Sequence, residues 1–125
     1  MHQPEIVLRR ARRTDFDAVA ALLGIAGEAE PGRQELRRFR RVVADLGSDF
    51  YVAVQDSVVV GFVHVTYARQ VFAPPRARVE RLESAAGERR DGIRQALTRL
   101  AQERAMRRGC SAIDLTAASG DLLPG

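Results

Sequence analysis

Residues 78–97 read RVERLESAAGERRDGIRQAL, and this stretch decides how the rest of the chain is arranged. Residues 78–85 predict a strand that carries the carboxylate of Glu80, and a short charged turn with two arginines leads into a helix beginning at Gly92. A helix N-terminus is an anion site, because its first N–H groups lack intrahelical partners and its dipole end is positive. We therefore predict a base beside a cradle for a phosphate-bearing ligand.

The composition is that of one ordinary globular domain spanning residues 1–125. The chain is 46% hydrophobic and 29% charged, and a chain of this length buries roughly two-thirds of its unfolded surface. All 20 basic residues are arginine and the net charge is only +4. Nucleic-acid-binding proteins usually carry a denser basic face with aromatic residues among the charges. The composition therefore argues against nucleic acid as a partner, and the mild positive charge also fits anionic small molecules.

Metal, disulfide and membrane features are all weak in this sequence. The single cysteine, Cys110, excludes an intramolecular disulfide, and two histidines with one cysteine are fewer than the four ligands of a usual structural zinc site. No apolar run approaches the roughly 18 residues of a membrane-spanning helix, and the N-terminus shows no signal-peptide pattern. We expect a cytoplasmic protein with no metal and no membrane partner.

Hydrophobic periodicity divides the rest of the chain into alternating elements. The predicted elements are a strand over 5–11, a helix capped by Thr14 and ended by Gly24 and Gly27, a helix over 34–46, strands over 50–55, 58–69 and 78–85, a helix over 92–108 and a strand over 110–116. Residues 28–33 are expected to form a loop, and residues 117–125 a loose tail. The order β-α-α-β-β-β-α-β predicts an antiparallel meander in the middle and a parallel crossover at the end. The fold class is therefore mixed α/β (α+β), with a central mixed sheet of about five strands flanked by helices.

Gly61 and the turn Asp56-Ser57 are expected to have special backbone geometry. Gly61 lies inside a strand, which indicates a β-bulge or a close approach of another element. The two-residue turn Asp56-Ser57 joins two strands, and such turns require positive φ angles. Phe50 and Val52 are expected on one face of their strand, with Tyr51 on the other.

The order of elements and the organising stretch together resemble the GNAT superfamily of acyl-CoA-dependent N-acyltransferases. The family's acyl-CoA motif, Arg/Gln-x-x-Gly-x-Gly/Ala after a strand, is similar to residues 89–94 here, which read RRDGIR and follow the strand of Val79 and Leu82. The hairpin over 51–62 is similar to the family's second and third strands. The resemblance extends from Ile6 to Thr116.

This resemblance implies acetyl-CoA as co-substrate and a primary amine of a small molecule or peptide as acceptor. It implies that the pantetheine arm pairs with the strand through the backbone near Leu82, Glu83 and Ser84, where a β-bulge splays the sheet, and that a backbone N–H near Glu83 or Ser84 polarises the thioester carbonyl. Glu80 matches the position of a general base for direct attack by the amine, helped by partial burial. The implied cofactor-binding residues are Leu82, Glu83, Ser84, Arg89, Arg90, Asp91, Gly92, Ile93 and Arg94.

The sequence departs from the family pattern at several places. Arg94 replaces the final Gly/Ala of the motif, and its side chain would either block the pyrophosphate or add a cation to the cradle. Arg90 replaces a residue that is commonly Gly, and Glu83-Ser84 replace apolar residues. The family continues with a helix, which often bears a Tyr that protonates the leaving thiolate, and with two more strands. Tyr51 and Tyr67 lie on other strands and are expected to be packing residues, so neither is expected to take the role of this Tyr. An open sheet edge after Thr116 leads us to expect a homodimer.

Two classes of function remain open at this point. One is an N-acetyltransferase with Glu80 as general base, and the other is a GNAT-like binding or regulatory domain without catalysis. A more distant alternative is nucleic-acid binding by the arginine-rich face over 37–41, which is more simply a solvated helix face. His64 alternates with core valines and is expected to be a core or groove histidine more often than a base.

Overall fold

The structure, a computed structural model, describes residues 5–24 and 32–118. Its elements are β1 (Val7–Arg10), a 3₁₀ turn (Arg13–Asp15), α1 (Phe16–Leu22), α2 (Arg33–Ala44), β2 (Asp49–Gln55), β3 (Val58–Ala68), β4 (Arg76–Ser84), α3 (Arg90–Arg107) and β5 (Ala112–Asp114). The predicted order is confirmed. Gly27, most of the predicted loop over 28–33 and all but the first two residues of the predicted tail over 117–125 lie outside the described residues.

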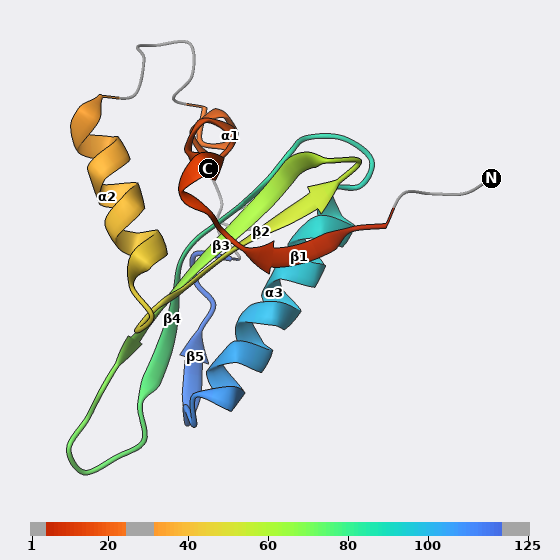
Figure 1. Cartoon of the computed structure of the whole chain (residues 1–125). Coiled ribbons are helices and arrows are strands. Elements are labelled where there is room, and N and C mark those ends of the chain that lie inside the picture. The colour runs from red at the N-terminus through yellow and green to blue at the C-terminus, as the bar shows by residue number, and fades with distance from the viewer. Residues whose placement is uncertain (1–4, 25–31, 119–125) are drawn as a thin grey trace.

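The five strands form a single mixed sheet in the order β1-β2-β3-β4-β5 (Figure 1). Strands β1 to β4 are antiparallel neighbours, and β4 and β5 are parallel. The helix α3 connects these two parallel strands, as the crossover rule requires. The expected fold class is therefore correct.

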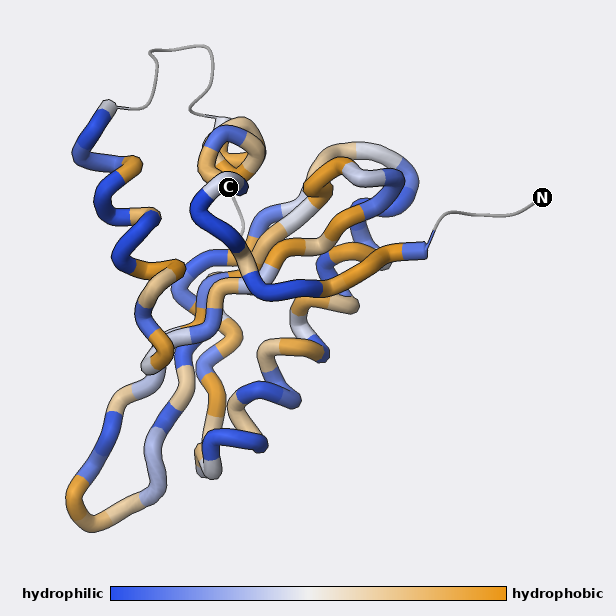
Figure 2. The backbone as a smooth tube through the Cα atoms, in the orientation of Figure 1, coloured by the Kyte–Doolittle hydropathy of each residue, from blue (hydrophilic) through white to orange (hydrophobic). Residues whose placement is uncertain are grey.

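The two faces of the sheet carry separate cores. On one face, α3 packs through Ile93, Leu97 and Ala101 against β3 and β4. On the other face, Val19 of α1 and Phe39 of α2 pack on aromatic and aliphatic residues of β2 and β3. Along the tube, α2 alternates between hydrophobic and strongly hydrophilic residues (Figure 2), so burial of one apolar stripe holds this helix in place.

The face assignments and the turn predicted for the β2–β3 hairpin are confirmed. Phe50 and Val52 belong to the core under α1 and α2, whereas Tyr51 packs toward α3. Asp56 and Ser57 have φ angles of 51° and 64°, the left-handed values that a two-residue turn between twisted strands requires.

The start of α1 differs from the expected Thr14 cap. Asp15 accepts a hydrogen bond from the backbone N–H of Arg12 at 2.7 Å and pairs with both terminal nitrogens of Arg9 at 2.8 and 2.9 Å. This buried carboxylate is the acceptor for a backbone N–H at the start of the turn, so the hydroxyl of Thr14 is not needed as a cap.

A buried charged cluster forms where β2 begins. Asp49 is 1% exposed and accepts hydrogen bonds from the guanidinium groups of Arg10, Arg104 and Arg108, the shortest at 2.9 Å. The hydroxyl of Tyr67 also donates to this carboxylate, and Arg108 lies over the Tyr67 ring at 4.5 Å. Burial alone would raise the pKa of Asp49, but the hydrogen bonds outweigh it and hold the pKa well below its usual range.

Gly61 marks the close approach of α3 to β3. A Cβ atom at this position would lie 2.8 Å from Cγ2 of Ile93, 3.0 Å from Cδ1 of Leu97 and 3.0 Å from the carbonyl oxygen of Glu83. We expect Gly61→Ala to destabilise the fold by about 1–3 kcal/mol, because the added methyl group overpacks this contact. Denaturant unfolding would measure it.

Gly92→Ala is the matched control for Gly61→Ala. No atom lies within 4 Å of a Cβ placed at Gly92, and alanine favours a helix over glycine. Equal denaturation midpoints for the wild type and Gly61→Ala would show that α3 does not pack closely on β3 at Gly61.

Candidate functional site

A β-bulge in β4 changes which side chains point toward α1 and α2. His64 pairs with Arg81 and the next residue of β3, Val65, pairs with Val79, so Glu80 is the extra residue. Val79 and Leu82 consequently both face the α3 core, and Glu80 and Arg81 are both displaced to the opposite face. The resemblance implied a bulge near Leu82 to Ser84, and the structure places it two residues earlier.

Glu80 is more exposed than expected. Its side chain is 39% exposed, accepts a hydrogen bond from the hydroxyl of Thr66 at 2.7 Å, and lies 4.0 Å from Nε of Arg78. It lines a cavity of about 590 Å³ that also includes Asp114 of β5. Glu80 thus stands at a junction of β3, β4 and β5, oriented by a hydroxyl donor.

Strands β4 and β5 separate immediately after they pair. Arg76, Ala77 and Arg78 pair with β5, and from residue 79 to 84 the β5-facing edge of β4 has no strand partner among the described residues. Such an edge offers unpaired backbone donors and acceptors inside the sheet. An extended ligand segment could pair there as an added strand.

Arg94 lies across this opening. Its guanidinium donates to the carbonyl oxygen of Leu82 at 3.4 Å and to that of Ala118 at 2.8 Å, linking β4 to the turn after β5. Burial, and next the positive charge of Arg90, lower the pKa of Arg94. The residue that replaces the small one of the motif therefore points into the gap between β4 and β5.

The start of α3 presents free backbone donors. The N–H groups of Arg90 and Ile93 are used within the turn, by Gly87 and Arg89 respectively. The N–H groups of Asp91 and Gly92 have no backbone acceptor among the described residues. The space beside Gly92 is open, and the two preceding arginines, Arg89 and Arg90, add cationic donors.

Four other predicted cofactor residues differ in burial and in their hydrogen-bond or ion-pair partners. Ile93 is 2% exposed and its side chain belongs to the core. Glu83 pairs with Arg81 at 3.1 Å, and the Asp91 carboxylate is 97% exposed. Ser84 Oγ is buried without a hydrogen-bond partner, an uncommon state that an incoming polar group would relieve.

These donors fit the chemistry of acetyl-CoA. Two backbone N–H groups at a helix start, with Arg89 beside them, suit a diphosphate. The open edge of β4 suits the amide groups of a pantetheine arm, and the unpaired hydroxyl of Ser84 lies at the end of that edge. Among the described residues, no group of three His, Cys, Asp or Glu could hold a metal ion.

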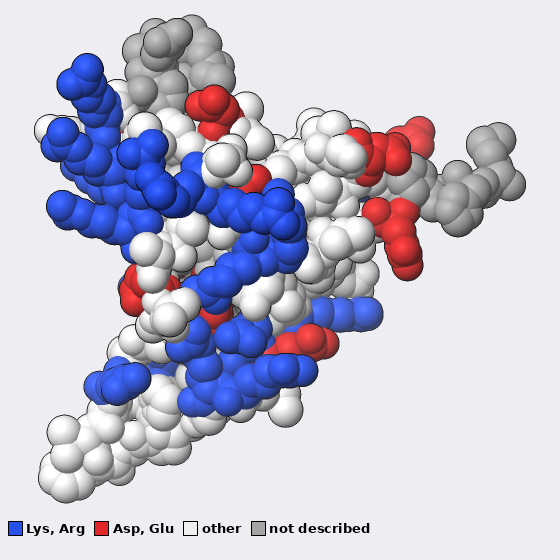
Figure 3. Space-filling model, viewed as in Figure 1, with Lys and Arg blue, Asp and Glu red and all other residues white. Residues whose placement is uncertain are grey.

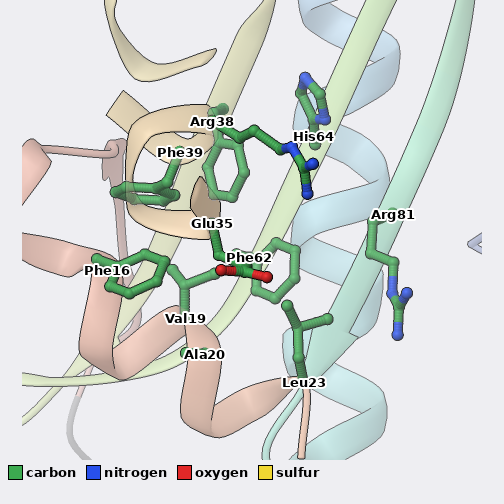
Figure 4. A pocket seen from close by; sticks show the side chains of 11 residues that line it. Phe16, Val19, Ala20, Leu23, Glu35, Arg38, Phe39, Phe62, His64 and Arg81 are labelled. Carbon is green, nitrogen blue, oxygen red and sulfur yellow. The ribbon is translucent and has the colours of Figure 1, made fainter. Parts of the chain in front are cut away.

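A second hollow, which we call the aromatic pocket, lies between α1, α2 and the sheet. Its volume is about 280 Å³. Phe50 connects the aromatic residues at its base, with ring centroids 5.5 Å from Phe39, 5.3 Å from Phe62 and 5.3 Å from His64. Its lining residues are Phe16, Val19, Ala20, Leu23, Glu35, Arg38, Phe39, Phe50, Phe62, His64 and Arg81 (Figure 4).

The expectation that His64 is a core or groove histidine is confirmed. It lines the aromatic pocket and is stacked on Phe50. Burial lowers the pKa of His64, and the nearby charges of Glu80 and Asp45 oppose this shift. A neutral imidazole can accept a proton. Its alternation with Phe62 on β3 was the one signal in the sequence that could have placed it beside an aromatic wall.

Comparison with known sequences gives one family. A sequence model described as the acetyltransferase (GNAT) family matches residues 15–122. Comparison with curated proteins gave no match.

Solved structures share this arrangement. A transcriptional regulator from Bacillus halodurans superposes with a TM-score of 0.78 at 25% identity, covering 88% of this chain and 80% of that chain. A putative acetyltransferase from Agrobacterium tumefaciens gives 0.74 at 20% identity, covering 86% and 78%. The aminoglycoside N-acetyltransferase AAC(6')-Iy in complex with CoA gives 0.76 at 15% identity, covering 97% and 86%.

Proposed function

We propose that this chain, which belongs to the acetyltransferase (GNAT) family, transfers an acetyl group to a primary amine of a small molecule or peptide. Acetyl-CoA is the co-substrate that the family assignment supports. The observation that carries the proposal is the pair of free N–H groups at Asp91 and Gly92 beside the open edge of β4. The start of α3 receives the phosphates of acetyl-CoA, and the open edge of β4 receives its pantetheine arm.

The proposed reaction needs a base near the bulge in β4. Once the ammonium has lost one proton, the amine nitrogen bonds to the carbonyl carbon of the thioester and the carbon–sulfur bond breaks. The sulfur leaves as a thiol, with the second proton that the nitrogen loses. Glu80 is the candidate acceptor of the ammonium proton, held by the hydroxyl of Thr66. His64 is a second candidate, since it interacts electrostatically with Glu80 and lines the aromatic pocket. The aromatic pocket is the proposed acceptor site, because it opens on the face to which the bulge displaces Glu80.

Release of the CoA thiol in the presence of a panel of amines tests this proposal. We expect amine-dependent thiol release above the rate of acetyl-CoA hydrolysis without acceptor. A protein that binds acetyl-CoA and releases no thiol with any amine would support the second candidate, a binding domain without catalysis.

The specific observation in favour of that second candidate is Arg94, which occupies the acceptor on Leu82. An added strand needs the same carbonyl. We expect Arg94→Ala, which restores a motif residue, to tighten acetyl-CoA binding about tenfold, because two charge-assisted hydrogen bonds no longer have to be broken. Calorimetric titration would measure it, with the exposed Arg99→Ala on the same helix as control.

A result opposite to this tightening would assign Arg94 the role of a phosphate ligand. Weaker binding by Arg94→Ala, with a shallower dependence on salt, would show that the guanidinium turns to the phosphates and supplements the cradle. Unchanged binding would contradict both roles.

We also propose a homodimer in a cytoplasmic setting. Strand β5 pairs on one side with β4, and its other edge has no strand partner among the described residues, so a second copy could cover it. A monomer by light scattering at micromolar concentration would exclude this. Within residues 5–24 and 32–118, no helix is long and apolar enough to cross a membrane.

A further inference from the structure

We propose that the acceptor bound in the aromatic pocket is a zwitterion with one apolar side chain, such as a free aromatic or aliphatic α-amino acid, rather than a polycation. This inference rests on the proposed function and names the substrate class of the same site. It follows from the size of the pocket, its apolar base and the charges at its rim.

The base of the pocket suits a single apolar group. Phe16, Phe39, Phe50 and Phe62 form a continuous run of ring contacts with centroids 5.3 to 5.5 Å apart. Aromatic walls of this kind bind an apolar or aromatic side chain well. The volume of about 280 Å³ lies near the lower end of the usual range for small-molecule sites, roughly 300–1,000 Å³. A ligand with several sugar rings would exceed it.

The rim offers one partner for each charge of a zwitterion. Glu35 and Arg38 both line the pocket from α2. The carboxylate of Glu35 lies beside Gly32 at the start of this helix, and Arg38 extends in the direction of His64 (Figure 4). Neither side chain has a hydrogen-bond or ion-pair partner among the described residues, and the two do not pair with each other. An arginine fork recognises a carboxylate with two parallel hydrogen bonds. The carboxylate of Glu35 attracts the ammonium group to the rim, and Glu80 remains the candidate that takes its proton.

The surrounding surface disfavours a polycation. Arginines gather along α2 beside the pocket (Figure 3), and they include Arg33, Arg37, Arg40 and Arg41. Arg81 adds a further cation to the rim, although Glu83 pairs with it. A single rim carboxylate cannot offset this field for a ligand with several ammonium groups. A ligand that brings its own carboxylate gains from the same field.

Calorimetric binding of L-phenylalanine, 2-phenylethylamine, L-phenylalaninamide and kanamycin tests the inference, each with and without CoA. We expect L-phenylalanine to bind at least about tenfold more tightly than 2-phenylethylamine and L-phenylalaninamide, which lack the carboxylate. Arg38→Ala should abolish that difference. The control Arg37→Ala, which changes an exposed arginine of the same helix outside the pocket, should preserve it.

Other outcomes overturn the assignment. Equal binding of L-phenylalanine and L-phenylalaninamide would indicate a peptide N-terminus, and tighter binding of kanamycin would indicate a polycationic acceptor. Binding of none of the four ligands, with or without CoA, would remove amino acids as the substrate class. Binding of CoA alone is read separately in the same titrations, so a failure of the cofactor site would not be confused with a failure of the acceptor site.

Discussion

Asp49→Ala is expected to lower the free energy of unfolding by about 3–5 kcal/mol, the cost of removing one partner from a buried ion pair. The wild-type carboxylate is 1% exposed and pairs with three guanidinium groups, those of Arg10, Arg104 and Arg108. Without it, these cations repel one another and the hydroxyl of Tyr67 loses its acceptor. Urea unfolding at neutral pH would measure the loss.

Two variants separate the parts of this effect. Tyr67→Phe removes one hydroxyl and keeps the ring under Arg108, so it should cost about 1 kcal/mol. Asp17→Ala removes an exposed carboxylate of α1 and should change stability by less than about 0.5 kcal/mol. A loss at Asp49 no larger than that at Asp17 would show that the cluster does not stabilise the fold.

Acid should weaken this cluster in a defined direction. The folded pKa of Asp49 is held below its unfolded value of about 3.9. Its stabilising contribution is therefore complete above that value and is lost as the pH falls through the folded pKa. We expect the stability gap between the wild type and Asp49→Asn to narrow below pH ~4. A gap that widens on acidification would contradict the assignment.

Glu80→Gln is expected to reduce amine acetylation about 100-fold or more at neutral pH, the usual contribution of a general base. Glutamine keeps the size of the side chain and an oxygen that can accept from Thr66. It cannot take the ammonium proton, so the variant depends on amine that is already deprotonated in solution. Its rate should rise about tenfold per pH unit below the pKa of the acceptor.

His64→Gln, compared in the same assay, identifies the base. If Glu80 takes the proton, His64→Gln should lose much less activity and keep the wild-type pH profile. The reverse pattern, with His64→Gln acquiring the steep pH dependence, would transfer the role to the histidine beside Phe50. Acetyl-CoA binding should be unchanged in both variants, since neither residue lies at the start of α3.

The unit from β4 to α3 was predictable because its signals are local. A charged turn, a glycine at the helix start and an apolar stripe are all encoded within residues 78–108. The tight contact at Gly61 and the positive φ angles at Ser57 were also visible, because each imposes a backbone condition at one position.

The features that escaped prediction depend on residues far apart in the sequence. The bulge at Glu80 is set by the register with β3, and the direction of Arg94 is set by a gap that exists only once β4 and β5 separate. Asp49 collects partners up to 59 residues away, which no local pattern marks. His64 has the sequence pattern of a core residue, and only the position of α2 turns its surroundings into a pocket.

Calorimetric titration of acetyl-CoA into the wild type and Gly92→Trp tests whether the start of α3 binds the cofactor. A tryptophan would fill the open space beside Gly92, whereas the control Gly92→Ala adds one methyl group there. We expect binding by the wild type with a dissociation constant on the order of micromolar, retained binding by Gly92→Ala and none by Gly92→Trp. No binding by the wild type up to millimolar acetyl-CoA, or equal binding by Gly92→Trp, would contradict a cofactor site at the start of α3.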